Sequence, residues 1–493
     1  MAIKTISNAG GNFNTTGAWT DGILPIAGDS VIATATSGPL TISAATVSIV
    51  SANFTNYTST LTIDNVFNIT TTVVFVAGMT IAGTTGTLTI TPTTGASLTS
   101  GGKTLTCNLT TAGTSQTYTL VDNWTVDGTV TLQGTTTQII NGNSLFCNSN
   151  LIVNGVAQSG STTIILSGTG SWSSAFTGRV LQNNLTINTS GTITFDSAQV
   201  LNYNTGTLTY IAGDVITTDS TLTIAASTTL NLGLMPTALN NLTISATSTI
   251  TLSSTLSVNG TFTISASCTW NGSILYIGGN LTLTTPTSAT TSGTTLFILN
   301  GTGTWSANTT TSVIRNNLTI NTNGIITFGA IVVFSTQTLT YISGKVIIPR
   351  NSVFHITLVV TTTLINCHKI NFNVIQITAG GFVVMNEFFS GSPNKPIRIQ
   401  AATAANYNIT FQNGYEKIAK FVKVSNLTLT NTAISRGSLL ILNNKGKYFR
   451  GSNNIGNIRY TNTTPNGIAK GDPTVPNQMT APIGGYLSDP VFN

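Results

Sequence analysis

Carboxyl and imidazole groups supply most acid–base catalysis in proteins, and this chain has few of them: twelve Asp and Glu and two His among 493 residues. Cleavage of a glycosidic bond needs two carboxyl groups that converge on one sugar. The closest pairs are Asp122 with Asp127 and Asp214 with Asp219, both five residues apart. An odd spacing places the members of a pair on opposite faces of an unbroken strand. We therefore expect these aspartates in turns, and we predict that the protein is not an enzyme.

The two histidines also lack a catalytic setting. Cys367 and His368 are consecutive in the sequence, which raises the question of a catalytic thiol–imidazole pair. Neighbouring residues of a strand point to opposite faces, so proton transfer between the two is not expected. His355 lies between Phe354 and Ile356 in a strand-like run, which favours a partly buried structural role.

The cysteines are spread along the chain. They are Cys107, Cys147, Cys268 and Cys367. They form no CxxC motif and have no histidine cluster nearby, so the sequence predicts buried free thiols, no metal site and no disulfide framework. No phosphate-binding glycine motif is present, and no cofactor is expected.

A basic and aromatic cluster near the C-terminus is the candidate partner-binding surface. It consists of Lys445, Lys447, Tyr448, Phe449 and Arg450 in "NNKGKYFRGSNN". Aromatic faces with neighbouring cations can stack on sugars, bind acidic cell-surface polysaccharide or hold nucleic acid, and nucleic acid is the least expected of these ligands. Two other interpretations stay open: a solvated turn whose lysines protect a β edge, and a docking surface for an acidic part of the same particle.

Charge is scarce and unevenly distributed. Charged residues make up 6% of the chain, against about 25% in ordinary domains. Residues 1–340 contain four basic and eight acidic side chains, whereas residues 341–493 contain fourteen and four. Hydroxyl and amide groups must therefore keep most of the surface soluble. No apolar run of about 18 residues and no signal-like start occur, so we expect neither membrane insertion nor a signal peptide.

The chain contains an internal duplication. "GTGSWSSAFTGRVLQNNLTINTSGTITF" begins at Gly168 and "GTGTWSANTTTSVIRNNLTINTNGIITF" at Gly301, with 18 identities in 28 positions. Within each copy, apolar residues alternate with Thr and Asn, a period of two that predicts strands with one apolar and one hydroxylated face.

A longer period indicates how the strands are arranged. Similar phrases begin at Leu222, Leu242, Phe262 and Leu281, about 20 residues apart. A lap of this length predicts an all-β fold, a right-handed parallel β-solenoid (β-helix) with rungs of about 20 residues. Hairpins and stacked β-sandwiches of the immunoglobulin type are the alternatives, because they also give short alternating strands.

The composition divides the solenoid into regions. We predict an N-terminal β-helical region at 1–165, a repeat-bearing shaft at 166–345 and a basic β region at 346–460. Five prolines within 461–493 and the lack of alternation predict an extended tail there.

Both ends of the chain resemble one family. The opening "GNFNTTGAWTDGILPIAGDSVIATATSGPLTI", with Trp19, Pro25 and Asp29, resembles the entry of β-helical structural proteins of tailed bacteriophages. "FSGSPNKPIRIQAATAANYNITF", "SNLTLTN" and "GSNNIGNI" resemble the way such proteins close, although Ile458 stands where an aromatic residue is common. The resemblance implies a fibre or other virion-surface component, commonly trimeric.

These observations lead to one functional expectation and two alternatives. We expect a phage structural protein that forms a fibre or surface appendage at the virion surface and attaches to the host surface. Its expected partners are other virion proteins, further copies of itself and host glycans. The alternatives are a tailspike-like polysaccharide depolymerase, which would use the four aspartates named first, and a bacterial surface adhesin.

Overall fold

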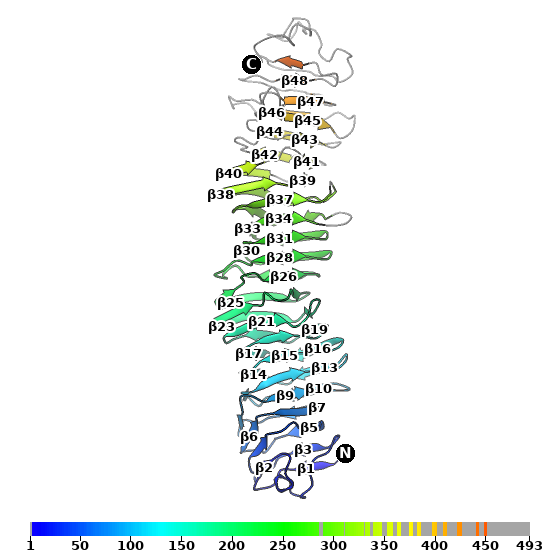
Figure 1. The fold of residues 1–493 in the computed structure, drawn as a ribbon, viewed down its shortest axis with the longest axis vertical. Helices are drawn as coiled ribbons and strands as arrows, with labels where there is room; N and C mark the ends of the chain where they lie inside the picture. The colour runs from blue at the N-terminus through cyan, green and yellow to red at the C-terminus, as the bar shows by residue number, and fades with distance from the viewer. Residues whose placement is uncertain are drawn as a thin grey trace. The chain divides into compact units, whose positions relative to one another are not determined.

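The computed structural model describes residues 2–284, 289–309, 311–329 and 331–335, and from residue 339 onward the strands alone. It is a parallel β-solenoid of about 14 turns, with rungs of about 21 residues. The chain divides into two compact units, Met1–Asn241 and Leu242–Asn493. Figure 1 labels strands of each unit.

Parallel strands of the first unit stack into three ladders. The first ladder contains β7 (Val66–Val74), β9 (Thr87–Ile90), β12 (Asn108–Thr111), β15 (Val130–Leu132), β18 (Leu151–Val153), β21 (Gly170–Ser174) and β23 (Asn184–Phe195). The second contains β1 (Ile3–Thr5), β3 (Ser30–Ile32), β5 (Ile49–Asn53), β7, β10 (Ala96–Thr99), β13 (Thr117–Leu120), β16 (Thr137–Gly142), β19 (Ala157–Ser159), β22 (Val180–Leu181), β24 (Leu201–Tyr203) and β26 (Thr221–Ile224).

The third ladder has two stretches. They are β2 (Gly11–Asn12), β4 (Leu40–Ile42), β6 (Thr60–Ile63) and β8 (Thr80–Ala82), and then β11 (Thr104–Leu105), β14 (Trp124–Val126), β17 (Leu145–Cys147), β20 (Thr163–Leu166), β23, β25 (Thr207–Ile216) and β27 (Thr228–Asn231). The 3-10 helix η1 (Thr16–Ala18) lies near the N-terminus.

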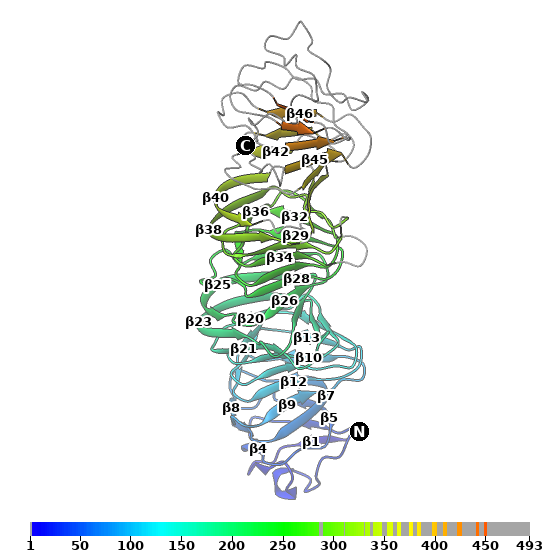
Figure 2. The same ribbon diagram turned by 45° about the horizontal axis from the view of Figure 1, so that its top comes forward.

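The second unit repeats this arrangement (Figure 2). One ladder contains β28 (Asn241–Ile244), β31 (Thr261–Ile264), β34 (Asn280–Leu283), β37 (Gly303–Ala307) and β38 (Leu318–Phe328). The others contain β29 (Ser248–Leu252), β32 (Cys268–Gly272) and β35 (Thr291–Ser292), and β30 (Leu256–Val258), β33 (Ile274–Ile277), β36 (Leu296–Leu299), β38 and β40 (Leu339–Ile347).

Later strands of this unit continue the parallel pairing. They are β39 (Ile331–Ser335), β41 (Val353–Thr357), β43 (Val374–Ile377), β45 (Ile397–Ala401) and β47 (Val422–Ser425), and β42 (Thr362–Ile365), β44 (Phe382–Met385) and β46 (Asn408–Phe411). The last two, β48 (Leu440–Leu442) and β49 (Tyr448–Arg450), pair antiparallel.

The rung length follows from the strand register. In the first ladder, one inward position is occupied on successive rungs by Leu88, Leu109, Val130, Leu151 and Trp172, each 21 residues after the last. All five are buried. The parallel pairing confirms the predicted solenoid and rules out stacked sandwiches for the described residues, since sandwich sheets are antiparallel.

Apolar columns form the interior. Leu185, Ile187, Ile193 and Phe195 are all buried, as their period of two predicted. The five tryptophans are buried as well: Trp19, Trp124, Trp172, Trp270 and Trp305. In the part of the chain whose side chains are described, these stacked inward groups are removed from water and stabilise the short strands.

The sequence duplication is also a structural one. Asn183 and its counterpart Asn316 are fully buried, and each donates from Nδ2 to a main-chain oxygen, of Thr162 and of Thr295 respectively, at 3.1 Å. The two acceptors are again 133 residues apart. A substitution in one copy can therefore be compared with its counterpart in the other.

Several sequence predictions concern residues beyond this description. The extended tail at 461–493 lies outside the described residues, and the division at 165, 345 and 460 stays a prediction. In the part of the chain that the structure describes, no helix is long and apolar enough to span a membrane.

Candidate functional site

Asp122 and Asp127 flank strand β14 and bond to neighbouring rungs. The two carboxylate oxygens of Asp122 accept hydrogen bonds from the main-chain nitrogens of Ser100, at 2.6 Å, and Gly101, at 2.8 Å. Asp127 is exposed and accepts a hydrogen bond from Asn148 Nδ2 at 2.7 Å. Both carboxylates therefore hold turns of adjacent rungs together.

The other aspartates of interest are exposed or sit in turns. Asp219 lies in a turn at φ +56°, a left-handed conformation that Asp tolerates better than most residues. Asp196 accepts a hydrogen bond at Oδ1 from the nitrogen of Ala198, at 3.0 Å. Asp214 differs from expectation, because it is exposed inside strand β25, directly after Gly213.

Three of the four cysteines are described, and they are buried free thiols, as predicted. Burial raises the pKa of Cys107 to about 11 and those of Cys147 and Cys268 to about 12. A thiol with so high a pKa is a poor nucleophile at neutral pH. Among the described residues, no three His, Cys, Asp or Glu side chains gather as metal ligands would.

The remaining predicted site residues are only partly placed. His355 lies in β41, opposite Val333 of β39, while Cys367 and His368 lie outside the described residues. Lys445 and Lys447 also lie outside them. Tyr448, Phe449 and Arg450 form strand β49, for which the backbone alone is described. The binding role of this cluster stays a prediction.

One outward side of the first unit is an array of hydroxyl and amide groups. This hydroxyl–amide face consists of the outward residues of the first ladder: Thr87, Asn108, Thr129, Asn150, Ser171 and Thr194, and beside them Thr89, Thr110, Thr131, Ile152 and Ser173. All are half-buried and none is charged, and Ile152 is the one apolar side chain among them. Successive rungs repeat these groups at about 4.8 Å, the spacing of neighbouring strands.

Asparagines keep the face in register. Asn108 Oδ1 accepts a hydrogen bond from the nitrogen of Thr129 at 2.8 Å, and Asn150 Oδ1 accepts one from the nitrogen of Ser171 at 2.9 Å. The threonine hydroxyls on this face are donors and acceptors at once. The face thus presents an ordered set of neutral hydrogen-bonding groups.

A corner with an exposed aromatic ring follows β21, one of the strands of this face. Phe176 stands two residues after the end of β21, and 56% of its surface is exposed. The guanidinium carbon of Arg179 lies 5.4 Å from the centroid of the Phe176 ring. Arg179 forms no ion pair with any described residue. An aromatic face beside a cation with free donors is typical of contacts with sugars and other polar rings.

Hydrogen bonds on both sides fix the corner. Ser174 Oγ donates to the oxygen of Phe176 at 2.8 Å, and Thr177 Oγ1 donates to Gln199 Oε1 of the next turn at 3.0 Å. Asn202 Nδ2 donates to the oxygen of Arg179 at 3.1 Å. A corner held this way loses little conformational entropy when a ligand binds.

The second copy has a different corner. Thr309 and Ser312 stand where the first copy has Phe176 and Arg179, and their hydroxyls bond to each other at 2.9 Å. Phe176 and Arg179 were not predicted as site residues, because the residues that the two copies share indicate the fold and these two are not shared. The differences between the copies were the signal that indicates this corner.

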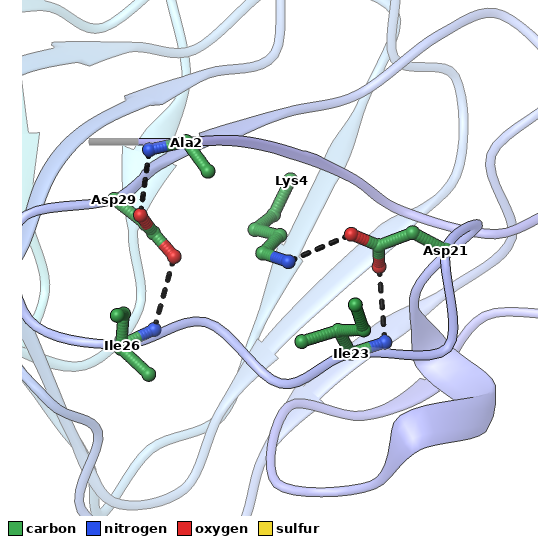
Figure 3. A network of polar contacts seen from close by, with 6 residues as sticks. All are labelled: Ala2, Lys4, Asp21, Ile23, Ile26 and Asp29. Carbon is green, nitrogen blue, oxygen red and sulfur yellow. Dashed lines mark hydrogen bonds and ion pairs between the residues drawn. The ribbon is translucent and has the colours of Figure 1, made fainter.

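A polar network holds the N-terminal end of the first unit (Figure 3). Lys4 Nζ bonds to Asp21 Oδ2 at 2.7 Å, and Asp29, 2% exposed, accepts from the nitrogens of Ala2 and Ile26 at 2.7 and 3.1 Å. The hydrogen bond from Lys4 lowers the pKa of Asp21, and that from Ala2 lowers the pKa of Asp29.

This network belongs to a cap on the first strand. Beyond β1, Ser7 N donates to Ala18 O at 2.8 Å and Thr20 N to Thr5 O at 3.0 Å, so residues 18–20 cover the open side of residues 5–7. The nearly buried ammonium of Lys4 also makes the end unsuitable for another strand. Native β proteins protect their edges by such coverage and inward charges, which prevent uncontrolled stacking.

The fold and its repeated faces define a β-solenoid, a β-helix repeat protein. Comparison with protein-family models, with curated proteins and with solved structures finds no match. The resemblance of its ends to phage proteins therefore has no independent support from a relative.

Proposed function

We propose that the chain is a non-enzymatic structural protein that contacts saccharides through the Phe176–Arg179 corner and the hydroxyl–amide face. The observation that carries this proposal is the corner itself: an exposed ring and a cation that has no acidic partner among the described residues, next to β21 of a neutral hydroxylated surface. A ring face packs against the C–H side of a sugar, and the guanidinium donates to its oxygens.

The neutral face suits the same class of ligand. Thr, Ser and Asn can each donate and accept, as sugar hydroxyl groups do. Single contacts of this kind contribute little, but a polysaccharide repeats its hydroxyls as the solenoid repeats its rungs, so many weak contacts add up. A surface of this kind favours reversible attachment to a polymer over capture of a small molecule.

The resemblance of the two ends supports a more specific setting. We propose that the protein is a fibre or surface appendage of a phage or related virus, that it assembles with further copies of itself, a trimer being favoured, and with other virion proteins. Its saccharide would then be a polysaccharide of the host surface.

The test uses the second copy as a guide. Phe176→Thr with Arg179→Ser gives the first corner the side chains of the second, which the same rung accommodates. Binding of the full chain to polysaccharides extracted from a panel of bacteria is measured by biolayer interferometry. The double variant should bind at least about tenfold more weakly, the size expected for one lost aromatic stacking contact.

A matched control is Ala175→Asn, which places the residue of the second copy, Asn308, at an exposed position of the same corner. It should bind as the wild type does. The proposal fails if the wild type binds no polysaccharide of the panel, or if the double variant binds as tightly as the control. Shortening of the polysaccharide during incubation would refute the non-enzymatic role.

A further inference from the structure

The duplicated stretch contains one projecting arm in each unit. We define the first arm as residues 189–192 with 211–214, and the second arm as residues 322–325 with 342–345. The first arm arises where the register of β23 against β25 shifts, and the second where the register of β38 against β40 shifts at the equivalent positions. Such bulges turn a pair of strands away from the regular ladder.

Equivalent hydrogen bonds shape the two arms. In the first arm, Thr189 Oγ1 donates to Gly168 O at 2.7 Å and accepts from Gly191 N at 2.9 Å. In the second arm, Thr322 Oγ1 donates to Gly301 O at 2.7 Å and accepts from Gly324 N at 2.8 Å. The two arms therefore have the same local backbone.

Each arm presents an isoleucine to solvent. Gly213 and Gly344, at φ +111° and +114°, adopt a conformation that favours glycine, and each follows the exposed isoleucine of its arm by two residues. Ile211 is 53% exposed and Ile342 is 60% exposed. These two isoleucines lie at equivalent places of the two arms. Covering such exposed apolar side chains with another apolar surface lowers the free energy.

The arms differ in charge. Asp214 of the first arm lies opposite Thr192, and Lys345 of the second arm lies opposite Ile325. These are equivalent positions, and their side chains are of opposite sign. The whole chain contains only twelve acidic side chains, so Lys345 has few alternative acidic partners. Complementary charges select a partner and its orientation.

We propose that the first arm of one copy of this chain packs against the second arm of another copy. Ile211 then covers Ile342, and Asp214 pairs with Lys345. The partner is a second copy because the same chain supplies both complementary arms. A contact between two different patches of identical chains closes into a ring or continues as a filament, depending on its angle. This inference goes beyond saccharide contact and does not depend on it.

The experiment is a charge swap on the full chain, followed by sedimentation velocity over a range of protein concentrations at low and high salt. Asp214→Lys and Lys345→Asp should each weaken association at least about tenfold, because each replaces attraction with repulsion. The double variant restores opposite charges and should associate within about threefold of the wild type. High salt should weaken association of the wild type.

The duplication protects this test from misfolding. Lys already stands at the equivalent position of the second arm and Asp at that of the first, so the arm backbone accepts either side chain. Asp64→Lys is the control, since it makes the same charge change at an exposed residue outside the arms. The proposal is overturned if the wild type stays monomeric, if the double variant associates no better than the single ones, or if Asp64→Lys weakens association as much as they do.

Discussion

The arms should be more sensitive to glycine substitution than left-handed positions where an added Cβ meets open space. Gly213→Ala places a Cβ at φ +111° and 2.4 Å from Thr189 Cγ2. The conformation alone costs about 1–2 kcal/mol for a residue with a Cβ. The contact also displaces Thr189, whose hydroxyl makes two hydrogen bonds worth about 1 kcal/mol each. We expect the first arm to lose about 3–4 kcal/mol of stability.

Two alanine controls separate the two causes. Gly178 has φ +83° with no atom within 4 Å of the added Cβ. Gly178→Ala should therefore reduce stability only by the penalty for a left-handed conformation, about 1–2 kcal/mol. Gly17 is not left-handed and also has open space, so Gly17→Ala should cost almost nothing. The expected order of destabilisation is Gly213, Gly178, Gly17.

Hydrogen exchange is the suitable assay, because solenoids open locally and a single global transition would average over many rungs. A loss of 3–4 kcal/mol reduces protection by roughly two to three orders of magnitude, since about 1.4 kcal/mol is tenfold. The loss should be confined to peptides of β23 and β25. Gly344→Ala, whose Cβ would lie 2.5 Å from Thr322 Cγ2, should act likewise on β38 and β40. Equal protection in Gly213→Ala and Gly178→Ala would show that the contact with Thr189 does not hold the arm.

Two further predictions concern groups with shifted pKa values. The pKa values of Asp21 and Asp29 lie below their ordinary value of 3.8, so the stability that they give the N-terminal cap is complete above that pH and is lost as the pH falls through the lowered values. Hydrogen exchange of residues 2–32 should show this loss. In Asp29→Asn the pH-dependent part of the loss should be smaller, because one of the two titrating carboxyl groups is gone. Cys107, Cys147 and Cys268 should stay unlabelled by iodoacetamide at pH 8 in the folded chain and react after unfolding, since burial raises the pKa of each thiol; peptide mapping that finds any of the three labelled in the folded protein would contradict this assignment.

The architecture could be predicted from the sequence because a solenoid repeats one local rule. Leu242, Phe262 and Leu281 do pair on successive rungs, as their spacing of about 20 indicated. The rung is nearer to 21 residues, and the difference arises where turns and bulges add residues. Such additions carry no periodic signal, because a turn tolerates one more Gly or Thr without changing the strands on either side.

Inward polar residues were harder to predict. In "TTTQIING", Ile139 and Ile140 are adjacent, and the period of two alone does not say which of them faces inward. The structure buries Ile140 and Gln138 and leaves Ile139 37% exposed. Gln138 is tolerated inside because Thr111 donates to its Oε1 and Tyr118 accepts from its Nε2, both at 3.1 Å. Those partners lie on other strands, so only the assembled ladder reveals them.

The low charge of the chain makes salt a means of separating the two proposals. Hydrogen bonds and ring stacking with a neutral saccharide depend little on ionic strength. The proposed pairing of Asp214 with Lys345 is electrostatic, and at 1 M salt the Debye length is only about 3 Å, so the contribution of this pair should be largely lost. Saccharide binding that survives high salt while self-association weakens would therefore support both surfaces at once. Binding that weakens in parallel with self-association would instead indicate that the saccharide contact requires the assembled form.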